Sequence, residues 1–168
     1  MIKINKNIAL IGMPAVGKSS VGSLLAEKLG LEFIDADDLI QAGEQQTLAK
    51  IIFDKGLSRF LEIEEKHISG FKPDHHVIAT GGSAVYSPKA MEHLSKTCII
   101  LYLFIDFPGL LKRLSDLTSR GVSIRPGQTI QDLYYERTPL YERYCDIKID
   151  CSSLTLEQVV EKAVTALI

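Results

Sequence analysis

Residues 12 to 19 read Gly12-Met-Pro-Ala-Val-Gly17-Lys18-Ser19 and match the pattern G-x-x-x-x-G-K-[ST] of a phosphate-binding loop. The two glycines let the backbone turn tightly, so that successive N–H groups point inward and cradle phosphate oxygens. The ammonium group of Lys18 can reach the β- and γ-phosphates of a nucleotide, and the hydroxyl of Ser19 can bind Mg²⁺. The stretch therefore predicts a site for a nucleotide and its magnesium ion.

The sequence on both sides of this loop supports the interpretation. The apolar run Ile8-Ala-Leu-Ile11 precedes the loop and suits a buried strand. After the loop, apolar side chains recur at helical spacing up to Gly30, a residue that typically ends a helix. A strand, a glycine-rich loop and a helix in this order are the setting that the motif requires, and the N-terminal end of the helix favours bound phosphate.

Short apolar segments alternate with helical patterns along the rest of the chain. We expect further strands near 32–35, 77–79, 98–104 and 147–149, and helices near 47–56, 57–69, 88–94, 110–117, 130–144 and from 155 onward. The segment 36–46 is polar, and we expect no regular element there. The alternation predicts one α/β domain over residues 1–168, with a five-stranded parallel sheet covered by helices on both faces.

Residues 118–129 lack clear periodicity and contain two glycines and a proline. A loop of this length inside a compact domain is often functional, so we interpret it as a mobile lid. Arg125 lies within it, and an arginine on such a loop can neutralise charge on a γ-phosphate, although a solvated loop arginine is the alternative. Arg120 and Arg113 are further basic candidates, and Arg113 can equally belong to the outer face of a helix.

The composition argues against several classes of partner. The formal net charge is -2, the isoelectric point is about 6.1 and no basic run is present, so we expect no nucleic-acid surface. No apolar stretch approaches the roughly 20 residues that span a bilayer. The chain enters its first strand too early for a signal peptide, and its three cysteines lack C-x-x-C spacing, so we expect a cytoplasmic protein with free thiols.

Two carboxylates follow the second predicted strand. In open parallel sheets, ligands bind beyond the carboxyl ends of the strands, which is where Asp35 and Asp37 stand. Residues two apart in extended backbone face the same side, so one carboxylate could lie near Mg²⁺ and the other near an acceptor hydroxyl. The alternative is that Asp37 or Asp38 only caps the next helix.

A further arginine stands in a helix that also contains Pro139, a residue that suggests a bend. This residue, Arg137, could point into the cleft. It could also pair with Glu136 or Glu142 on the surface.

These motifs, taken together and in this order, resemble the shikimate kinase family. The likeness runs nearly end to end and includes the phosphate-binding loop, Phe33 to Asp37, Gly56 to Glu65, Thr80 to Val85, Arg125-Pro126 and Arg137 to Tyr141. It implies a three-layer P-loop kinase fold with a mobile lid. It also implies transfer of phosphate from ATP, with Mg²⁺, to a hydroxyl of a small molecule in aromatic amino acid biosynthesis.

The resemblance also implies roles for individual residues. The residues expected to contact the nucleotide are Gly12, Ala15, Val16, Gly17, Lys18, Ser19, Ser20 and Arg120. Ser19 and Asp35 would hold the metal, and Asp37 would accept a hydrogen bond from the acceptor hydroxyl. Gly81 and Gly82 would line the acceptor pocket through backbone groups, and Arg137 would bind the acceptor's carboxylate. The expected catalytic residues are Lys18, Asp37 and Arg125.

The acceptor pocket departs from the family pattern. The family has an arginine directly after Phe60 that pairs with the substrate carboxylate, and this chain has Leu61 there. The third glycine of the family's glycine turn is Ser83, and the stretch between Arg125 and Arg137 is short. Loss of such a charged hydrogen-bonded contact should cost roughly 2 kcal/mol or more of acceptor binding, so the acceptor need not be shikimate. Shikimate is the default acceptor, and another small hydroxy-acid or polyol is the alternative.

Two other classes of function remain open from the sequence. A nucleoside or nucleotide kinase shares the loop and lid but needs a base-binding pocket and usually more lid arginines. A non-catalytic ATP-binding regulator would keep the loop without turnover, which the intact set of loop lysine, aspartates and lid arginine argues against. We expect a monomer that binds a small molecule and neither nucleic acid nor membrane.

Overall fold

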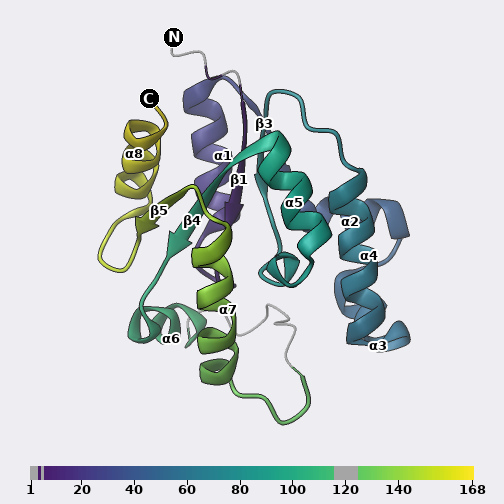
Figure 1. The fold of residues 1–168 in the computed structure, drawn as a ribbon. Coiled ribbons are helices and arrows are strands. Elements are labelled where there is room, and N and C mark those ends of the chain that lie inside the picture. The colour runs from purple at the N-terminus through teal and green to yellow at the C-terminus, as the bar shows by residue number, and fades with distance from the viewer. Residues whose placement is uncertain (1–3, 5, 116–124) are drawn as a thin grey trace.

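The computed structural model describes residue 4 and residues 6–115 and 125–168 (Figure 1). Its strands are β1 (Asn7–Ile11), β2 (Glu32–Asp35), β3 (His76–Ala79), β4 (Cys98–Phe104) and β5 (Ile147–Asp150). All neighbouring strands pair in parallel, in the order β2-β3-β1-β4-β5. The predicted five-stranded parallel sheet is therefore confirmed.

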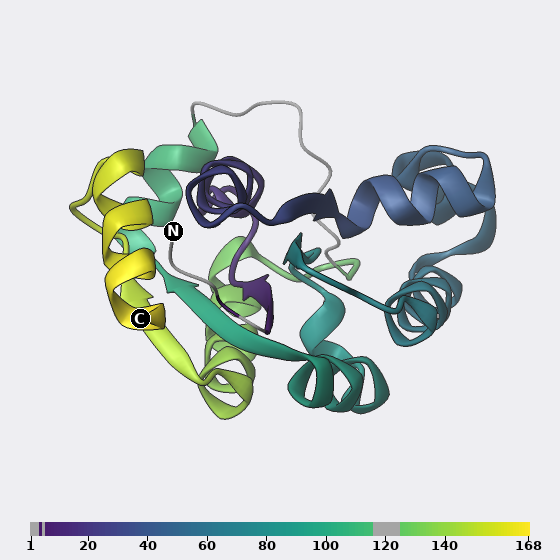
Figure 2. The same ribbon diagram turned by 90° about the horizontal axis from the view of Figure 1, so that it is seen from above.

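The helices cover both faces and one edge of this sheet. They are α1 (Lys18–Leu29), α2 (Ala36–Glu44), α3 (Leu48–Lys55), α4 (Leu57–Gly70), α5 (Pro88–Thr97), α6 (Phe107–Ser115), α7 (Ile130–Tyr144) and α8 (Leu156–Leu167), with a short 3₁₀ turn at Ala84–Tyr86. Figure 2 shows α1 and α8 on one face, α5 and α7 on the other, and the group α2 to α4 beside the β2 edge. This is the three-layer arrangement that the sequence predicts.

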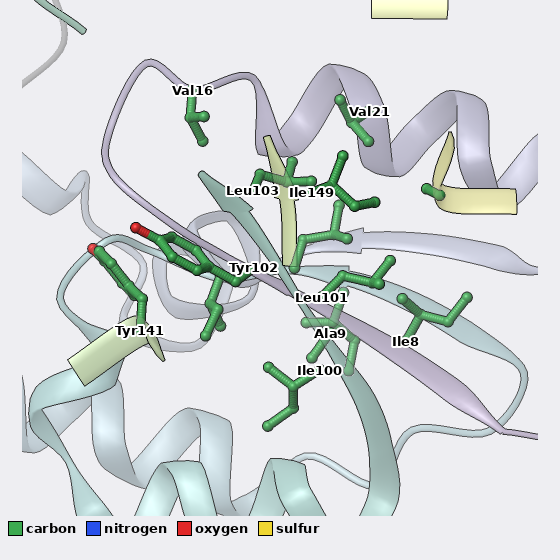
Figure 3. Packing of buried hydrophobic residues seen from close by; sticks show 14 of the residues in the cluster. Ile8, Ala9, Val16, Val21, Ile100, Leu101, Tyr102, Leu103, Tyr141 and Ile149 are labelled. Atoms are coloured by element: carbon green, nitrogen blue, oxygen red, sulfur yellow. The ribbon is translucent and has the colours of Figure 1, made fainter. Parts of the chain in front are cut away.

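The central strands are buried on both faces, which explains their unbroken apolar sequence. Ile8 of β1 and Leu101 of β4 have no exposed surface, and Figure 3 shows them packed among the side chains of neighbouring elements. Tyr102 of β4 stacks on Tyr141 of α7, with ring centroids 5.2 Å apart. Because parallel strands bury both faces, they lack the alternation of polar and apolar residues found in half-exposed strands.

The carboxyl ends of β1, β2 and β3 lie along one edge of the sheet, because the strands are parallel and in register. The residue after β3, Thr80, fixes two of these ends together. Its backbone N–H and its hydroxyl both donate to the carbonyl oxygen of Leu10, at 3.1 and 2.8 Å. The loop after β1 and the glycine turn after β3 therefore begin side by side.

One predicted segment is wrong, and another lies largely outside the described residues. The stretch 36–46 contains helix α2 instead of irregular polar chain, because Asp35 caps the helix and Ile40 anchors it in a small cluster with Ile51 and Phe60. Of the predicted lid, 118–129, the structure describes residues 125–129, which form no helix or strand, and Arg120 is not among the described residues.

Two expectations about the environment can be compared with the structure. Within the described ranges, the longest apolar helical segments fall short of what a membrane span requires. Cys98, Cys145 and Cys151 all carry free thiols, and the first and last of them are buried.

The packing of the central sheet makes a first prediction. Leu101→Ala removes a fully buried side chain, so we expect the free energy of unfolding to fall by about 2–5 kcal/mol in urea denaturation. Phe53→Ala is the control, because the Phe53 side chain is 89% exposed, and its effect should stay within about 0.5 kcal/mol. Equal losses for the two variants would contradict this description of the core.

Candidate active site

The loop after β1 passes very close to the end of β4. A Cβ atom on Gly12 would lie 2.6 Å from the carbonyl oxygen of Leu103, and the φ angle of Gly12 is 149°, so this position requires glycine. The buried side chain of Lys18 folds back over the loop, and its ammonium donates to the carbonyls of Gly12 and Met13 at 2.7 and 2.9 Å. The loop thus places the ammonium group of Lys18 at the carboxyl end of β1, the central strand of the sheet.

A second basic residue supports the loop from outside. The guanidinium of Arg113 in α6 donates to the carbonyl of Val16 at 2.6 Å and to that of Cys151 at 3.2 Å. The sequence left Arg113 as either a functional cation or a residue on a helix face. The structure shows that it ties α6 and the end of β5 to the phosphate-binding loop.

Ser19 and Asp35 meet where two helices begin. The Ser19 hydroxyl donates to Oδ2 of Asp35, whose Oδ1 accepts from the backbone N–H of Asp37 at 2.9 Å. Hydroxyl and carboxylate oxygens suit Mg²⁺, which usually keeps few protein ligands and takes others from water and phosphate. The described residues contain no cluster of three or more His, Cys, Asp or Glu side chains that could hold a metal alone. The donor pair therefore fits Mg²⁺ bound together with a nucleotide.

The expected geometry of the two aspartates is wrong in one respect. Asp37 does not share an extended strand with Asp35, because it lies in the first turn of α2, which Asp35 caps. The capping alternative named Asp37 or Asp38, and the structure assigns that role to Asp35. Asp37 still points to the glycine turn, since its Oδ1 lies 3.1 Å from the position of a Cβ on Gly81.

The glycine turn after β3 allows a carboxyl group and a guanidinium group to approach the backbone. A Cβ on Gly81 would lie 2.7 Å from Oε2 of Glu64, and one on Gly82 would lie 2.8 Å from Nη1 of Arg137. The carbonyl of Gly82 accepts from the hydroxyl of Tyr141 at 2.6 Å, which connects the turn to the core. Side chains at either position would displace these groups.

Glu64 is a member of the site that the sequence analysis missed. It is 2% exposed, and Ser83 donates to its Oε1 at 2.7 Å, while its buried Oε2 has no hydrogen-bond partner among the described residues. The pKa of Glu64 is raised to about 7, chiefly by burial and also by the charge of Asp37, against the lowering effects of the Ser83 hydrogen bond and of the charges of Arg137 and Lys18. Four-residue spacing to the apolar Phe60 and Ile68 was the available signal, because it places Glu64 on the buried face of α4.

Arg137 points into the cleft instead of pairing on the surface. Only 1% of it is exposed, its Nε donates to the Tyr86 hydroxyl at 3.2 Å, and its guanidinium carbon lies 5.1 Å from the centroid of the Tyr86 ring. The neighbouring carboxylate of Glu136 instead accepts from that Tyr86 hydroxyl, at 2.5 Å.

Most of the predicted site residues line a single cavity of about 450 Å³. Those residues are Ala15, Gly17, Lys18, Ser19, Asp35, Asp37, Gly81, Gly82 and Arg137. Gly12 and Val16 are buried within the loop, and Ser20 is exposed on α1. Arg125 lines a narrower adjoining recess, which Arg137 and Ser83 share with the main cavity. The cavity joins a phosphate-binding end to an end that contains the buried Arg137, the carboxyl groups of Asp37 and Glu64, and two glycines.

A parallel sheet, a phosphate-binding loop at its carboxyl edge and an acidic cavity beside it define a P-loop phosphotransferase. The family model for shikimate kinase matches residues 14–168, and the chain belongs to the shikimate kinase family. The resemblance proposed from the motifs is therefore confirmed. The chain is an ATP-dependent kinase that phosphorylates a hydroxyl group of a small molecule.

Individual relatives match over nearly the whole chain. The shikimate kinase of Thermodesulfovibrio yellowstonii is 39% identical over 162 residues, which are 95% of this chain and 93% of that protein. The shikimate kinase of Sulfurihydrogenibium sp. is 34% identical over 161 residues, 95% of this chain and 96% of that protein. The structure of the Acinetobacter baumannii shikimate kinase in complex with shikimate has a TM-score of 0.86 at 28% identity, covering 98% of this chain and 94% of that one.

The raised pKa of Glu64 makes a prediction about stability. The carboxyl ionises near pH 4.5 in the unfolded chain and near pH 7 in the folded one, so its contribution is complete below pH 4.5 and is lost as the pH rises to about 7. Relative to Glu64→Gln, the free energy of unfolding of the wild type should fall by roughly 3 kcal/mol across this range and stay level above it. Urea denaturation at a series of pH values measures this difference.

The matched control for this experiment is Glu62→Gln, because the Glu62 side chain is 65% exposed on the same helix. Glu62 forms an exposed ion pair with Arg59, so its loss should cost less than about 1 kcal/mol at any pH in the series. A constant difference for Glu64→Gln would show that Glu64 ionises in the folded protein as it does in the unfolded chain.

Proposed function

We propose that the protein transfers the γ-phosphate of ATP to a hydroxyl of shikimate. The observation that carries this proposal is the position of Arg137, a nearly fully buried cation at the glycine turn in the cavity that also contains Lys18 and Asp37. A buried guanidinium suits a planar carboxylate, which it can bind through two hydrogen bonds. The names of the relatives support the same acceptor, and the comparisons favour neither a nucleoside acceptor nor a non-catalytic regulator.

The donor end of the cavity serves ATP in this proposal. Lys18 binds the β- and γ-phosphates, and the backbone N–H groups of the loop surround them. Ser19 and Asp35 hold Mg²⁺, which supplies neutralising charge for the phosphates when it is bound. Arg113 keeps the loop in place through the carbonyl of Val16.

The acceptor end orients the hydroxyl that is phosphorylated. Asp37 accepts the hydrogen bond and then the proton of that hydroxyl as it attacks the phosphorus atom. Arg137 binds the carboxylate at the other end of the acceptor, and the backbone of Gly81 and Gly82 lines the space between. Ser83 holds Glu64 behind the glycine turn through a hydrogen bond. The burial of Glu64 keeps its carboxyl group protonated below about pH 7.

The same proposal extends to the oligomeric state, cellular location and partners of the protein. We infer that the chain acts as a single-domain monomer in the cytoplasm, in aromatic amino acid biosynthesis, and binds neither nucleic acid nor membrane. The net charge of -2 and the lack of a membrane-spanning helix in the described part of the chain support this inference. The recess beside Leu61, which Arg125 and Arg137 line, supports a carboxylate acceptor despite the missing family arginine.

The direct test is ADP release from ATP and Mg²⁺ with shikimate as acceptor. We expect saturable turnover with shikimate and much weaker turnover with nucleosides, because a nucleoside has no carboxylate for Arg137 to bind. Gluconate has a carboxylate but is acyclic, and we expect weaker turnover with it because the names of the relatives favour shikimate. Lys18→Ala is the negative control and should abolish turnover with every acceptor. A preference for gluconate or a nucleoside over shikimate would refute the proposed acceptor.

The role of Asp37 makes a separate prediction. Asp37→Asn keeps the size of the side chain but removes the base, so kcat should fall by roughly 10²- to 10⁴-fold while the KM for ATP changes little. Asp54→Asn is the control, because Asp54 forms an exposed ion pair with Lys50 on α3. Full activity of Asp37→Asn would show that Asp37 is not the base.

A further inference from the structure

The recess beside the acceptor end contains the position that departs from the family pattern. Leu57 and Leu61 of α4 form its apolar wall, and Tyr86 contributes an aromatic ring. Its cations, among the residues that the structure describes, are Arg125 and Arg137. Helix α4 therefore offers methyl groups where the family has a guanidinium, and a guanidinium from another segment faces them.

Both arginines lie against the same tyrosine ring. The guanidinium carbon of Arg137 is 5.1 Å from the centroid of Tyr86, and that of Arg125 is 5.9 Å from it. Distances of this size are typical of favourable cation–π contacts. The ring thus contacts two guanidinium groups at the edge of the acceptor cavity, and both can attract an anion that enters the recess.

Arg125 is held near α7 through its backbone more than through its charged group. Its N–H donates to Oε1 of Gln128 at 3.3 Å, and Nε2 of Gln128 donates to Oε2 of Glu136 at 3.1 Å. The guanidinium lies 3.9 Å from that carboxylate, and the Arg125 side chain is 61% exposed. An exposed ion pair at this distance is weak, so a ligand carboxylate can compete for the guanidinium.

We propose that Arg125, together with Arg137, binds the carboxylate of the acceptor and so replaces the arginine that this chain lacks at Leu61. The assignment rests on the proposed function, because it requires a carboxylate acceptor. It gives Arg125 a role at the acceptor, whereas a lid arginine that acts on the γ-phosphate would contact the nucleotide. Arg125 is then a specificity-determining residue, and two guanidinium groups again face the acceptor carboxylate.

Steady-state kinetics with two acceptors tests this assignment. One acceptor is shikimate, and the other is its neutral analogue in which a hydroxymethyl group replaces the carboxyl group. Arg125→Ala should raise the KM for shikimate by roughly 10- to 100-fold, the range expected for loss of a charged hydrogen bond. The KM values for ATP and for the neutral analogue should change by less than about threefold.

Leu61→Arg in the Arg125→Ala background supplies a second readout. The new guanidinium enters the same recess from α4, so the KM for shikimate should return to within about threefold of the wild-type value. Leu61→Met in that background is the uncharged control and should not restore it. Arg143→Ala removes an exposed arginine of α7 and should leave all constants unchanged.

The outcomes separate this assignment from the proposed function. If the wild type does not phosphorylate shikimate, the proposed function fails, and the assignment fails with it. If the wild type is active, but Arg125→Ala lowers kcat equally for both acceptors at an unchanged shikimate KM, Arg125 acts on the transferred phosphate and the assignment alone is overturned. Failure of Leu61→Arg to restore the KM also overturns it.

Discussion

The close passage of the phosphate-binding loop over the end of β4 is the contact on which the site depends. With no side chain at Gly12, the loop can lie against the carbonyl of Leu103. That approach turns the carbonyls of Gly12 and Met13 toward Lys18 and carries α1 back along the sheet. Two further contacts hold this region in place: Arg113 donates to the carbonyl of Val16 in the loop, and Thr80 donates to the carbonyl of Leu10 at the end of β1. A wider loop would move the lysine, the metal ligands and the start of α1 together.

The acceptor end solves a different physical problem, which is to bury charge beside a backbone turn. Arg137 and Glu64 are almost wholly removed from water, and an isolated ion there would be very unfavourable. The turn at Gly81 and Gly82 lets both groups come close to the main chain, and Ser83 satisfies one oxygen of Glu64. Burial raises the pKa of Glu64 and so favours its protonated form. The acceptor end therefore keeps the cation of Arg137, while the carboxyl group of Glu64 tends to be neutral.

The recess beside Leu61 brings the position on α4 that departs from the family pattern close to Arg125, which lies in the segment before α7. An apolar side chain on α4 and the guanidinium of Arg125 both line this recess, and Tyr86 contacts both of its arginines. The short connection between Arg125 and α7, held by Gln128 and Glu136, keeps that guanidinium beside the acceptor cavity. The acceptor pocket is thus built from α4, the glycine turn and the segment before α7 acting together.

The sequence by itself determined the sheet, most helices and the phosphate-binding loop, because each depends on local periodicity, capping residues or glycine positions. It missed α2, whose stability comes from the Asp35 cap and from the burial of Ile40 against α3 and α4. It also missed Glu64 as an acid of the site. The four-residue spacing to Phe60 and Ile68 indicates a buried face of α4, but the groups that pack over this face are set by the tertiary structure. Only the tertiary structure decided that Arg113 supports the loop, that Arg137 faces inward and that Arg125 lies beside Leu61. Those contacts join residues far apart in the chain, and their distances are set by how the helices pack on the sheet.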